Sequence, residues 1–253
     1  MFQLQDFESS PDIEKVSFDS IEKDLQERLY ILFSEASKQN LGVLLILEGW
    51  VASGKGDLLK CITTRLDPRR VKVISMEEEN LTDDKKHFMH EFWSKLPSYG
   101  EQLILDGSWY SKLSFQIQSK ILKKKQIPNA YKYIKDFEET ITNDRYIVLK
   151  YFLNISAKEQ KRRLKKASDE GKKWMVADSD WAEHEKYYDY KKLFEDYLSK
   201  TSFPTSPWKI VSAKNKFYTK IAVIESVIEV LELRLKVNSS EILKVISANE
   251  QAI

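Results

Sequence analysis

Residues 47–60 read LEGWVASGKGDLLK, and this stretch decides the fold. Gly49, Gly54 and Lys55 have the spacing G-x-x-x-x-G-K of a phosphate-binding loop. The apolar run GVLLIL at 42–47 predicts a buried strand before the loop, and GDLLKCITTRL at 56–66 predicts a helix after it. Glycines let main-chain amides turn toward phosphate oxygens, and the helix N-terminus adds its positive end. The alternative is a plain glycine-containing turn between a strand and a helix.

One position of this loop departs from the usual pattern. A Ser or Thr ordinarily follows the lysine, whereas here Gly56 and Asp57 follow Lys55. The lysine is expected to neutralise charge on a transferring phosphoryl group, which makes it a candidate catalytic residue. The predicted phosphate-binding residues of the loop are Gly49, Ser53, Gly54, Lys55 and Gly56.

Length and composition point to one folded unit. The 253 residues are 42% hydrophobic, which is enough for one sizeable core, and we expect a single domain over residues 1–253. The net charge of +2 gives no electrostatic reason to expect nucleic acid. Cys61 is the one cysteine, so an internal disulfide is excluded. The N-terminus lacks an apolar signal core and LGVLLIL is too short to span a membrane, so we expect a cytoplasmic protein without membrane partners.

Strands and helices alternate along the chain. Strands are predicted at 42–47, 71–76, 101–110 (running into a loop), 146–153 and 208–213. Helices are predicted at 17–39 with Ser17 as its N-cap, and at 56–66, 84–95, 129–142, from 156 onward, 180–201 and 217–236. Residues 237–253 are consistent with a short helix or a loose tail. The alternation predicts an α/β, three-layer P-loop fold, in which helices flank a five-stranded parallel sheet.

An acidic residue ends one of these strands. Asp106 follows the apolar run LIL at 103–105, an arrangement suited to holding Mg²⁺. Ligands of parallel sheets bind at the carboxyl ends of the strands, so we expect Asp106 and the phosphate loop at one edge. The alternative role for Asp106 is a helix cap or a turn residue. His87, His90 and His184 lack metal-ligand spacing and are expected to pack at a surface or an interface.

A basic segment follows the fourth strand. Its basic residues are Lys158, Lys161, Arg162, Arg163, Lys165, Lys166, Lys172 and Lys173. Such a run is usually a solvated helix face. In a P-loop kinase, however, a lid at about 156–180 would supply cations that cover the transferring phosphate and exclude water. We expect Arg162 and Arg163 to be catalytic, because guanidinium binds phosphate with two parallel hydrogen bonds, and Lys166 and Lys172 to bind phosphate.

Several motifs together resemble a known family. They are, in order, LEGWVASGKG, FWSKLP, DGSWYSK, DFEE, KYFLNISAKEQKRRLKK, DEGKKW and SPWKIVSAKNK. Over about residues 15–235 the chain resembles the second family of polyphosphate kinases, the P-loop polyphosphate:nucleotide phosphotransferases. The resemblance implies a thymidylate-kinase-like fold with a helical lid, Mg²⁺, polyphosphate and nucleoside mono- or diphosphates as partners, and a homo-oligomer, either a dimer or a tetramer. It assigns Gly49, Gly54, Lys55 and Gly56 to the phosphate loop, Asp106 to the metal, and Arg163 and Lys172 to the lid.

The chain also departs from the pattern of that family. The family usually has an aspartate at the position of Val51 and arginines at the positions of Glu91 and Gly107. Lys166 replaces another lid arginine, and Met175 replaces a lysine. Glu48 or Asp57 is the expected substitute for the carboxylate missing at position 51. GSWY, Asp180-Trp181 and ESVIEVLELRL resemble the N-terminal half of the fused, two-domain AMP-phosphorylating members.

Three functions follow as hypotheses. The first is a Mg²⁺-dependent phosphotransferase that moves a terminal phosphate between polyphosphate and a nucleoside mono- or diphosphate, with a partly degenerate active site. Loss of charges that stabilise the transition state would make it weak or inactive. The second is a non-catalytic relative that binds phosphate or polyphosphate and pairs with an active paralogue. The third is an ATP-dependent nucleoside monophosphate kinase, which the GSWY and SPW segments disfavour.

Overall fold

A five-stranded parallel sheet forms the centre of the protein. The computed structural model describes residues 2–76, 86–169 and 176–250. The strands are β1 (Gly42–Gly49), β2 (Val71–Ser75), β3 (Gln102–Asp106), β4 (Tyr146–Asn154) and β5 (Trp208–Ser212), in the order β2-β3-β1-β4-β5. The predicted parallel sheet is confirmed. β1 and β4 are buried almost throughout, as their unbroken apolar sequences require in a sheet covered on both faces.

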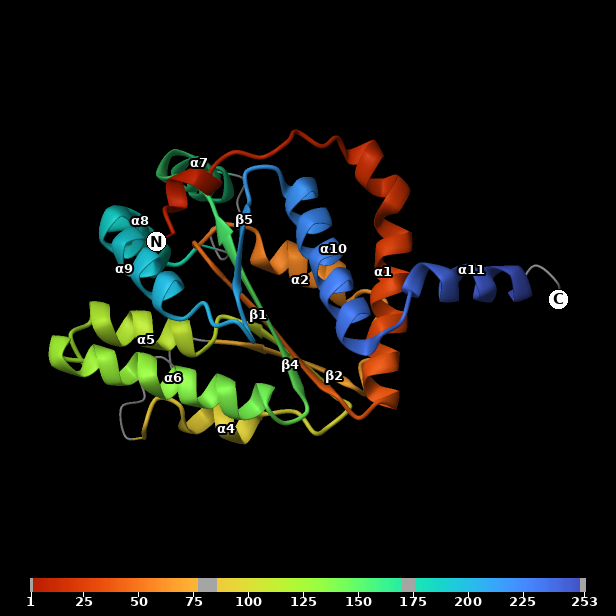
Figure 1. Ribbon diagram of the computed structural model, residues 1–253. Coiled ribbons are helices and arrows are strands. Elements are labelled where there is room, and N and C mark those ends of the chain that lie inside the picture. Colours follow the sequence, from red (N-terminus) through yellow and green to blue (C-terminus); the bar gives the residue numbers. More distant parts are fainter. Residues whose placement is uncertain (1, 77–85, 170–175, 251–253) are drawn as a thin grey trace.

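Helices cover both faces of the sheet, as predicted (Figure 1). One face carries α1 (Lys15–Lys38), α2 (Lys55–Thr63) and α10 (Lys216–Leu235). The other carries α4 (His90–Lys95), α5 (Trp109–Gln118) and α6 (Ile127–Thr142). The core lies between these layers and the sheet, where the central strands meet buried residues of α1, α5, α6 and α10.

The described residues between β4 and β5, among them most of the region predicted as a lid, form three helices. They are α7 (Ala157–Asp169), α8 (Asp178–Glu185) and α9 (Tyr187–Lys200). Ser156 caps α7 because its hydroxyl accepts a hydrogen bond from the amide of Glu159 at 3.3 Å. The predicted lid at 156–180 thus contains α7 and the start of α8, whereas residues 170–175 lie outside the described part of the chain.

Three boundaries predicted from the sequence are wrong. α1 begins at Lys15, so Ser17 lies in its first turn and is no N-cap. The third strand ends at Asp106, and α5 follows because the Ser108 hydroxyl caps it by accepting from the amide of Tyr110 at 3.2 Å. The single helix predicted at 180–201 is two helices, since the backbone leaves helical geometry at Lys186.

The remaining elements are short or peripheral. α4 covers only the end of the helix predicted at 84–95, and residues 84 and 85 lie outside the described ranges. The described residues include the 3₁₀ helices η1 (Leu4–Phe7) and η2 (Lys124–Gln126). Of the two alternatives for 237–253, the structure shows a helix, α11 (Ser239–Glu250), which projects from the body beyond α1 (Figure 1).

A buried ion pair joins the sheet to α6. The Lys150 Nζ and Glu138 Oε2 atoms are 2.7 Å apart, and neither side chain has any exposed surface. Tyr110 donates its hydroxyl to Glu138 Oε1 at 2.6 Å, and Ser206 donates to Glu138 Oε2 at 2.7 Å. Lys150 also donates to the carbonyl of Thr201 at 2.6 Å. These hydrogen bonds satisfy the two buried charges and connect α5, α6, β4 and the segment before β5.

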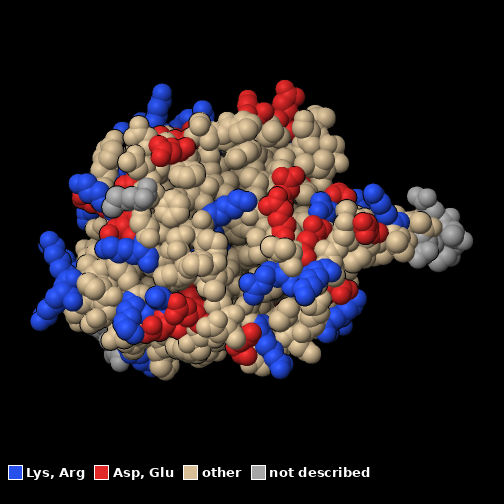
Figure 2. Space-filling model, in the orientation of Figure 1, with Lys and Arg blue, Asp and Glu red and all other residues tan. Residues whose placement is uncertain are grey.

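The surface carries charges of both signs. On the face shown in Figure 2, basic and acidic side chains are intermixed. Within the described ranges, none of the helices combines the length and apolar content that crossing a membrane requires.

Candidate active site

The phosphate loop connects β1 to α2 in a conformation that its first glycine makes possible. Gly49 has a φ of +138°, and a Cβ atom there would lie 2.4 Å from the carbonyl oxygen of Leu153. Any larger residue would therefore displace the backbone of β4. Lys55 is the first residue of α2, so its amide lies at the positive end of that helix. Its Nζ donates to the carbonyls of Gly49 at 3.1 Å and Trp50 at 3.3 Å.

The structure brings Asp106 to the phosphate loop. Strands β1 and β3 pair directly, with Leu47 opposite Asp106, so the loop and the aspartate leave the sheet at the same edge. Asp106 is half-buried and, with Lys55 and Val51, lines a cavity of about 460 Å³. Among the described residues, no group donates a hydrogen bond to the Asp106 carboxylate, which leaves its oxygens available to a ligand.

We call this cavity the acidic cavity, because four acids and one basic residue line it. Its charged residues are Glu48, Asp106, Asp180, Glu183 and Lys55. α8 closes one side through Asp180 and Glu183, and Ser114 of α5 contributes to another. The Ser114 hydroxyl is buried without a hydrogen-bond partner in the described part of the chain. An unpaired buried hydroxyl at a cavity wall is a group that a polar ligand can satisfy.

Glu48 has a structural role that the sequence does not suggest. Its Oε1 accepts from the amide and the hydroxyl of Ser108 at 2.8 and 2.7 Å, and from the amide of Ser111 at 3.2 Å. Its Oε2 accepts from the Ser111 hydroxyl at 2.7 Å. Burial raises the pKa of Glu48, while these hydrogen bonds and the charge of Lys55 act in the opposite direction. Its lone pairs are thus used to hold the start of α5.

Glu183 was missed by reasoning from the sequence. It lies on α8, 132 residues after the loop, yet its Oε1 accepts from the amide of Val51 at 3.0 Å. Gln160 of α7 donates to the same oxygen at 3.1 Å. Burial raises the pKa of Glu183 to about 7, against the opposing effects of these donors and of Lys55. No local signal marks this glutamate, because its position depends on how α8 packs over the loop.

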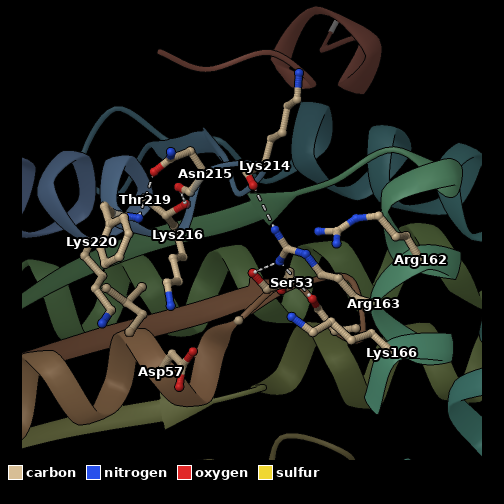
Figure 3. A pocket seen from close by; sticks show the side chains of 14 residues that line it. Ser53, Asp57, Arg162, Arg163, Lys166, Lys214, Asn215, Lys216, Thr219 and Lys220 are labelled. Carbon is tan, nitrogen blue, oxygen red and sulfur yellow. Dashed lines mark hydrogen bonds between the residues drawn. The ribbon is translucent and has the colours of Figure 1, made fainter. Parts of the chain in front are cut away.

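A second cavity lies on the other side of the loop. We call it the basic cavity; it has a volume of about 510 Å³ and one acidic lining residue, Asp57. Its basic lining residues are Arg162, Arg163, Lys166, Lys214, Lys216 and Lys220. Figure 3 shows the amines of Lys216 and Lys220 pointing toward Asp57, whereas Lys214 points away from them. Ser53 also lines this cavity, and its buried hydroxyl has no hydrogen-bond partner among the described residues.

Arg163 fixes the shape of the loop. Its Nη1 donates to the carbonyls of Ala52 at 3.0 Å and Ser53 at 3.1 Å, and its Nη2 donates to the carbonyl of Lys214 at 3.0 Å (Figure 3). Its Nε pairs with Glu159 at 2.7 Å. The guanidinium predicted to cover the phosphate is thus occupied by main-chain carbonyls, which makes it a brace between the loop, α7 and the end of β5.

The other predicted lid cations are placed differently. Arg162 is exposed and pairs with Glu159 at 2.7 Å. Lys166 lines the basic cavity beside Arg163 (Figure 3). Lys172, like Met175, lies outside the described residues.

Three of the positions that depart from the family pattern, Val51, Glu91 and Gly107, have surroundings that the structure describes. Val51 lines the acidic cavity and carries no charge into it. Glu91 pairs with Lys112 at 2.7 Å and Lys95 at 3.0 Å, so its charge is compensated locally. Gly107 has a φ of +77°, and a Cβ atom there would lie 3.1 Å from Ser111 Oγ. A side chain at this position is strained in the present backbone.

No ready-made metal cluster is present in the described ranges, where no three His, Cys, Asp or Glu residues are grouped to hold an ion. His87 packs against Phe88 and Tyr133, and His184 Nδ1 lies 2.8 Å from Gln160 Oε1. One carboxylate is enough for Mg²⁺ when substrate phosphates and water complete its shell. Asp106 therefore fits Mg²⁺, whereas His87 and His184 contact protein side chains.

Comparison with known proteins identifies the family. The family model for polyphosphate kinase 2 matches residues 13–239, which is most of the chain. The chain belongs to the polyphosphate kinase 2 family. NDP-polyphosphate phosphotransferase 1 of Ruegeria pomeroyi is 30% identical over 202 residues, covering 79% of this chain and 66% of that protein. The polyphosphate:AMP phosphotransferase of Pseudomonas syringae pv. tomato is 26% identical over 208 residues, covering 82% of this chain and 42% of that protein.

Solved structures of the family share the fold. A crystal structure of polyphosphate kinase 2 from Arthrobacter aurescens TC1 aligns with a TM-score of 0.79 at 26% identity, over 88% of this chain and 82% of the other. The putative polyphosphate kinase 2 from Pseudomonas aeruginosa PA01 aligns with a TM-score of 0.83 at 24% identity, over 90% of this chain and 49% of the other. The predicted P-loop kinase fold is thereby confirmed. This chain spans less than half of the Pseudomonas proteins compared here.

Proposed function

We propose that the protein transfers a terminal phosphate between inorganic polyphosphate and a nucleoside mono- or diphosphate. The observation that carries the proposal is that cavities of opposite charge lie on either side of one phosphate loop. A polyanion fits the basic cavity, because six cations line it and counterion release favours binding there. A nucleotide fits the acidic cavity, provided that a cation accompanies its phosphate. The names of the relatives, which act on polyphosphate with NDP or AMP, agree with these two substrates.

The residues support an in-line transfer between the cavities. An oxygen of the acceptor phosphate forms a bond to the terminal phosphorus, the bond from that phosphorus to its bridging oxygen breaks, and the electron pair leaves with the shortened chain. Lys55 lines the acidic cavity, and its neighbour Gly54 lines the basic one. The Lys55 ammonium can exchange its two carbonyl partners for phosphate oxygens. The hydroxyls of Ser53 and Ser114, which have no partner among the described residues, give each cavity one further donor. Arg163 holds the conformation of the loop through its hydrogen bonds to the carbonyls of Ala52 and Ser53.

A Mg²⁺ ion is part of the proposal. Asp106 would hold it at the carboxyl end of β3, where no described residue occupies the carboxylate. The ion would neutralise charge on the phosphate oxygens. Arg162 and Lys166 would bind the chain of phosphates at the mouth of the basic cavity, and Lys172 is proposed for the same role from the resemblance alone.

Turnover tests the proposal. The purified protein would be incubated with Mg²⁺, polyphosphate and AMP, ADP, GMP or GDP in turn, and with ATP in place of polyphosphate as a control donor. We expect nucleotide phosphorylation from polyphosphate, reduced about a hundredfold or more by Lys55→Ala. Lys60→Ala, at an exposed position of the same helix, should leave the rate unchanged. Background rates in both the wild type and Lys55→Ala would reject transfer and favour the non-catalytic polyphosphate-binding role.

We also propose a domain organisation, a location and an oligomeric state, namely one domain, the cytoplasm and a dimer or tetramer. The strands and flanking helices form one continuous core, which supports a single domain. The projecting helix α11 exposes Val245 and Ile246, apolar surface that a second copy could cover. Light scattering coupled to size exclusion would determine the oligomeric state, and a monomer at micromolar concentration would contradict this part.

A further inference from the structure

Glu183 places a carboxylate directly on the phosphate loop. Its Oε1 accepts from the amide of Val51 at 3.0 Å, and the side chain lines the acidic cavity together with Lys55. In the described part of the chain, no other acidic side chain accepts a hydrogen bond from the backbone of the loop between Gly49 and Lys55. The loop itself has no acid here, because residues 50–53 are Trp, Val, Ala and Ser.

The position of this carboxylate is fixed from several directions. Gln160 is fully buried, and its amide nitrogen donates to Glu183 Oε1 at 3.1 Å. The amide oxygen of Gln160 lies 2.8 Å from His184 Nδ1. At the start of α9, Tyr187 stacks on Trp50 of the loop with ring centroids 3.9 Å apart. The loop, α7, α8 and the start of α9 therefore form one packed unit, in which Glu183 is constrained rather than free on the surface.

The two acids expected to replace a carboxylate at position 51 are in other roles. All four hydrogen bonds of Glu48 go to Ser108 and Ser111, so it holds α5. Asp57 lines the basic cavity, on the other side of the loop. Of the three acids, Glu183 alone combines contact with residue 51 and access to the acidic cavity.

We propose, on the basis of the proposed function, that Glu183 supplies from α8 the negative charge that the loop lacks at residue 51, and that it acts there as a positioning residue. A carboxylate beside a phosphate is repelled unless a cation lies between them, so Glu183 favours a cation-bound phosphate over a bare one. Because the charge comes from α8, it reaches the loop only when α8 lies over the cavity.

Removing the carboxylate at position 183 and introducing one at position 51 tests this proposal by kinetics. Glu183→Ala should lower kcat about tenfold or more, and Glu183→Gln should lose as much, although it keeps an acceptor for the Val51 amide. In the Glu183→Ala background, Val51→Asp should restore most of the loss, whereas the neutral and similarly sized Val51→Asn should not. Glu185→Ala, an exposed position on the same helix, is the matched control. Unchanged kcat in Glu183→Ala, or equal effects of Val51→Asp and Val51→Asn, would overturn the proposal.

A binding measurement keeps the test independent of turnover. Calorimetry would give the affinity for ADP with saturating Mg²⁺ and again with EDTA, because the acidic cavity that Glu183 lines is the proposed nucleotide site. The ratio of the two affinities is the readout. Glu183→Ala should reduce this ratio about tenfold, and Glu185→Ala should not change it. If the wild type shows no turnover, the proposed function fails, and this ratio alone decides on Glu183. A ratio of one in the wild type, or the same ratio in Glu183→Ala, would refute its role.

Discussion

Glu48 at the end of β1 accepts hydrogen bonds from both the amide and the hydroxyl of Ser108, at 2.8 and 2.7 Å. Together with two bonds from Ser111, these contacts tie the strand before the phosphate loop to the first turn of α5. The loop and the segment after Asp106 are therefore held in one rigid arrangement, although 60 residues separate Glu48 from Ser108.

Glu48→Gln should destabilise the protein, because the amide side chain has one acceptor oxygen for donors that now use two. We expect the free energy of unfolding to fall by about 1–3 kcal/mol in urea titrations followed by circular dichroism. Glu229→Gln is the control, since the Glu229 side chain is 73% exposed. Equal stability of both variants would show that the Ser108 and Ser111 contacts contribute nothing.

The buried pair of Lys150 and Glu138 should respond strongly to loss of one partner. Lys150→Met leaves the Glu138 carboxylate buried beside Tyr110 and Ser206 without its cation, and we expect a loss of about 3–5 kcal/mol. Lys132→Met removes a pair with Asp136 of similar length at the surface and should cost less than about 1 kcal/mol. Chemical denaturation of both variants measures the difference, and comparable losses would contradict this reading of the core.

Gly107 and Gly56 should differ in their tolerance of a side chain. Gly107→Ala introduces a Cβ at φ +77° and 3.1 Å from Ser111 Oγ, so we expect a loss of about 1–3 kcal/mol. At Gly56 a Cβ would meet nothing within 4 Å, and Gly56→Ala should preserve stability or increase it slightly. Thermal unfolding of Gly107→Ala and Gly56→Ala measures both changes in stability. An arginine introduced at 107 would carry the same strain, so restoring the family residue there is expected to impair folding.

The stability of the wild type should depend on pH through Glu183. Its pKa is raised to about 7 in the folded state from 4.5, so the unfolded chain releases this proton first as the pH rises. Stability therefore falls between about pH 4.5 and 7, by up to about 3 kcal/mol. Glu183→Gln lacks this ionisation, so it should gain stability relative to the wild type from pH 5 to pH 8. A difference that stays constant across this range would show that the pKa of Glu183 is not raised.

The sequence was sufficient for the parts of the fold that depend on local patterns. β1, the loop and α2 follow each other within 22 residues, and their apolar runs and glycines predict them directly. α5 was missed because its N-cap, Ser108, follows the strand at once, and its apolar residues continue the strand's pattern. The break at Lys186 was missed because the stacking of Tyr187 on Trp50 is a tertiary contact.

In the candidate site, too, topology and local patterns could be predicted, whereas tertiary contacts could not. Lys55 and Asp106 could be placed at one edge because parallel strands share the direction of their carboxyl ends. The positions of Arg163 and Glu183 could not be predicted, since both depend on how α7 and α8 pack over the loop. The motifs GSWY, DFEE and SPW, which carry much of the resemblance, meet around Glu138 in the core, where Tyr110 and Ser206 bind its carboxylate.

The stack of Trp50 on Tyr187 provides an optical reporter within the molecule. The Trp50 indole is fully buried, donates to Asn154 Oδ1 at 2.9 Å and is part of the loop, while its stacking partner is the first residue of α9. The wavelength and intensity of the Trp50 fluorescence emission should change whenever the loop and Tyr187 separate. Subtracting the spectrum of a Trp50→Phe variant would isolate that signal, so opening could be followed in stopped flow with no attached dye.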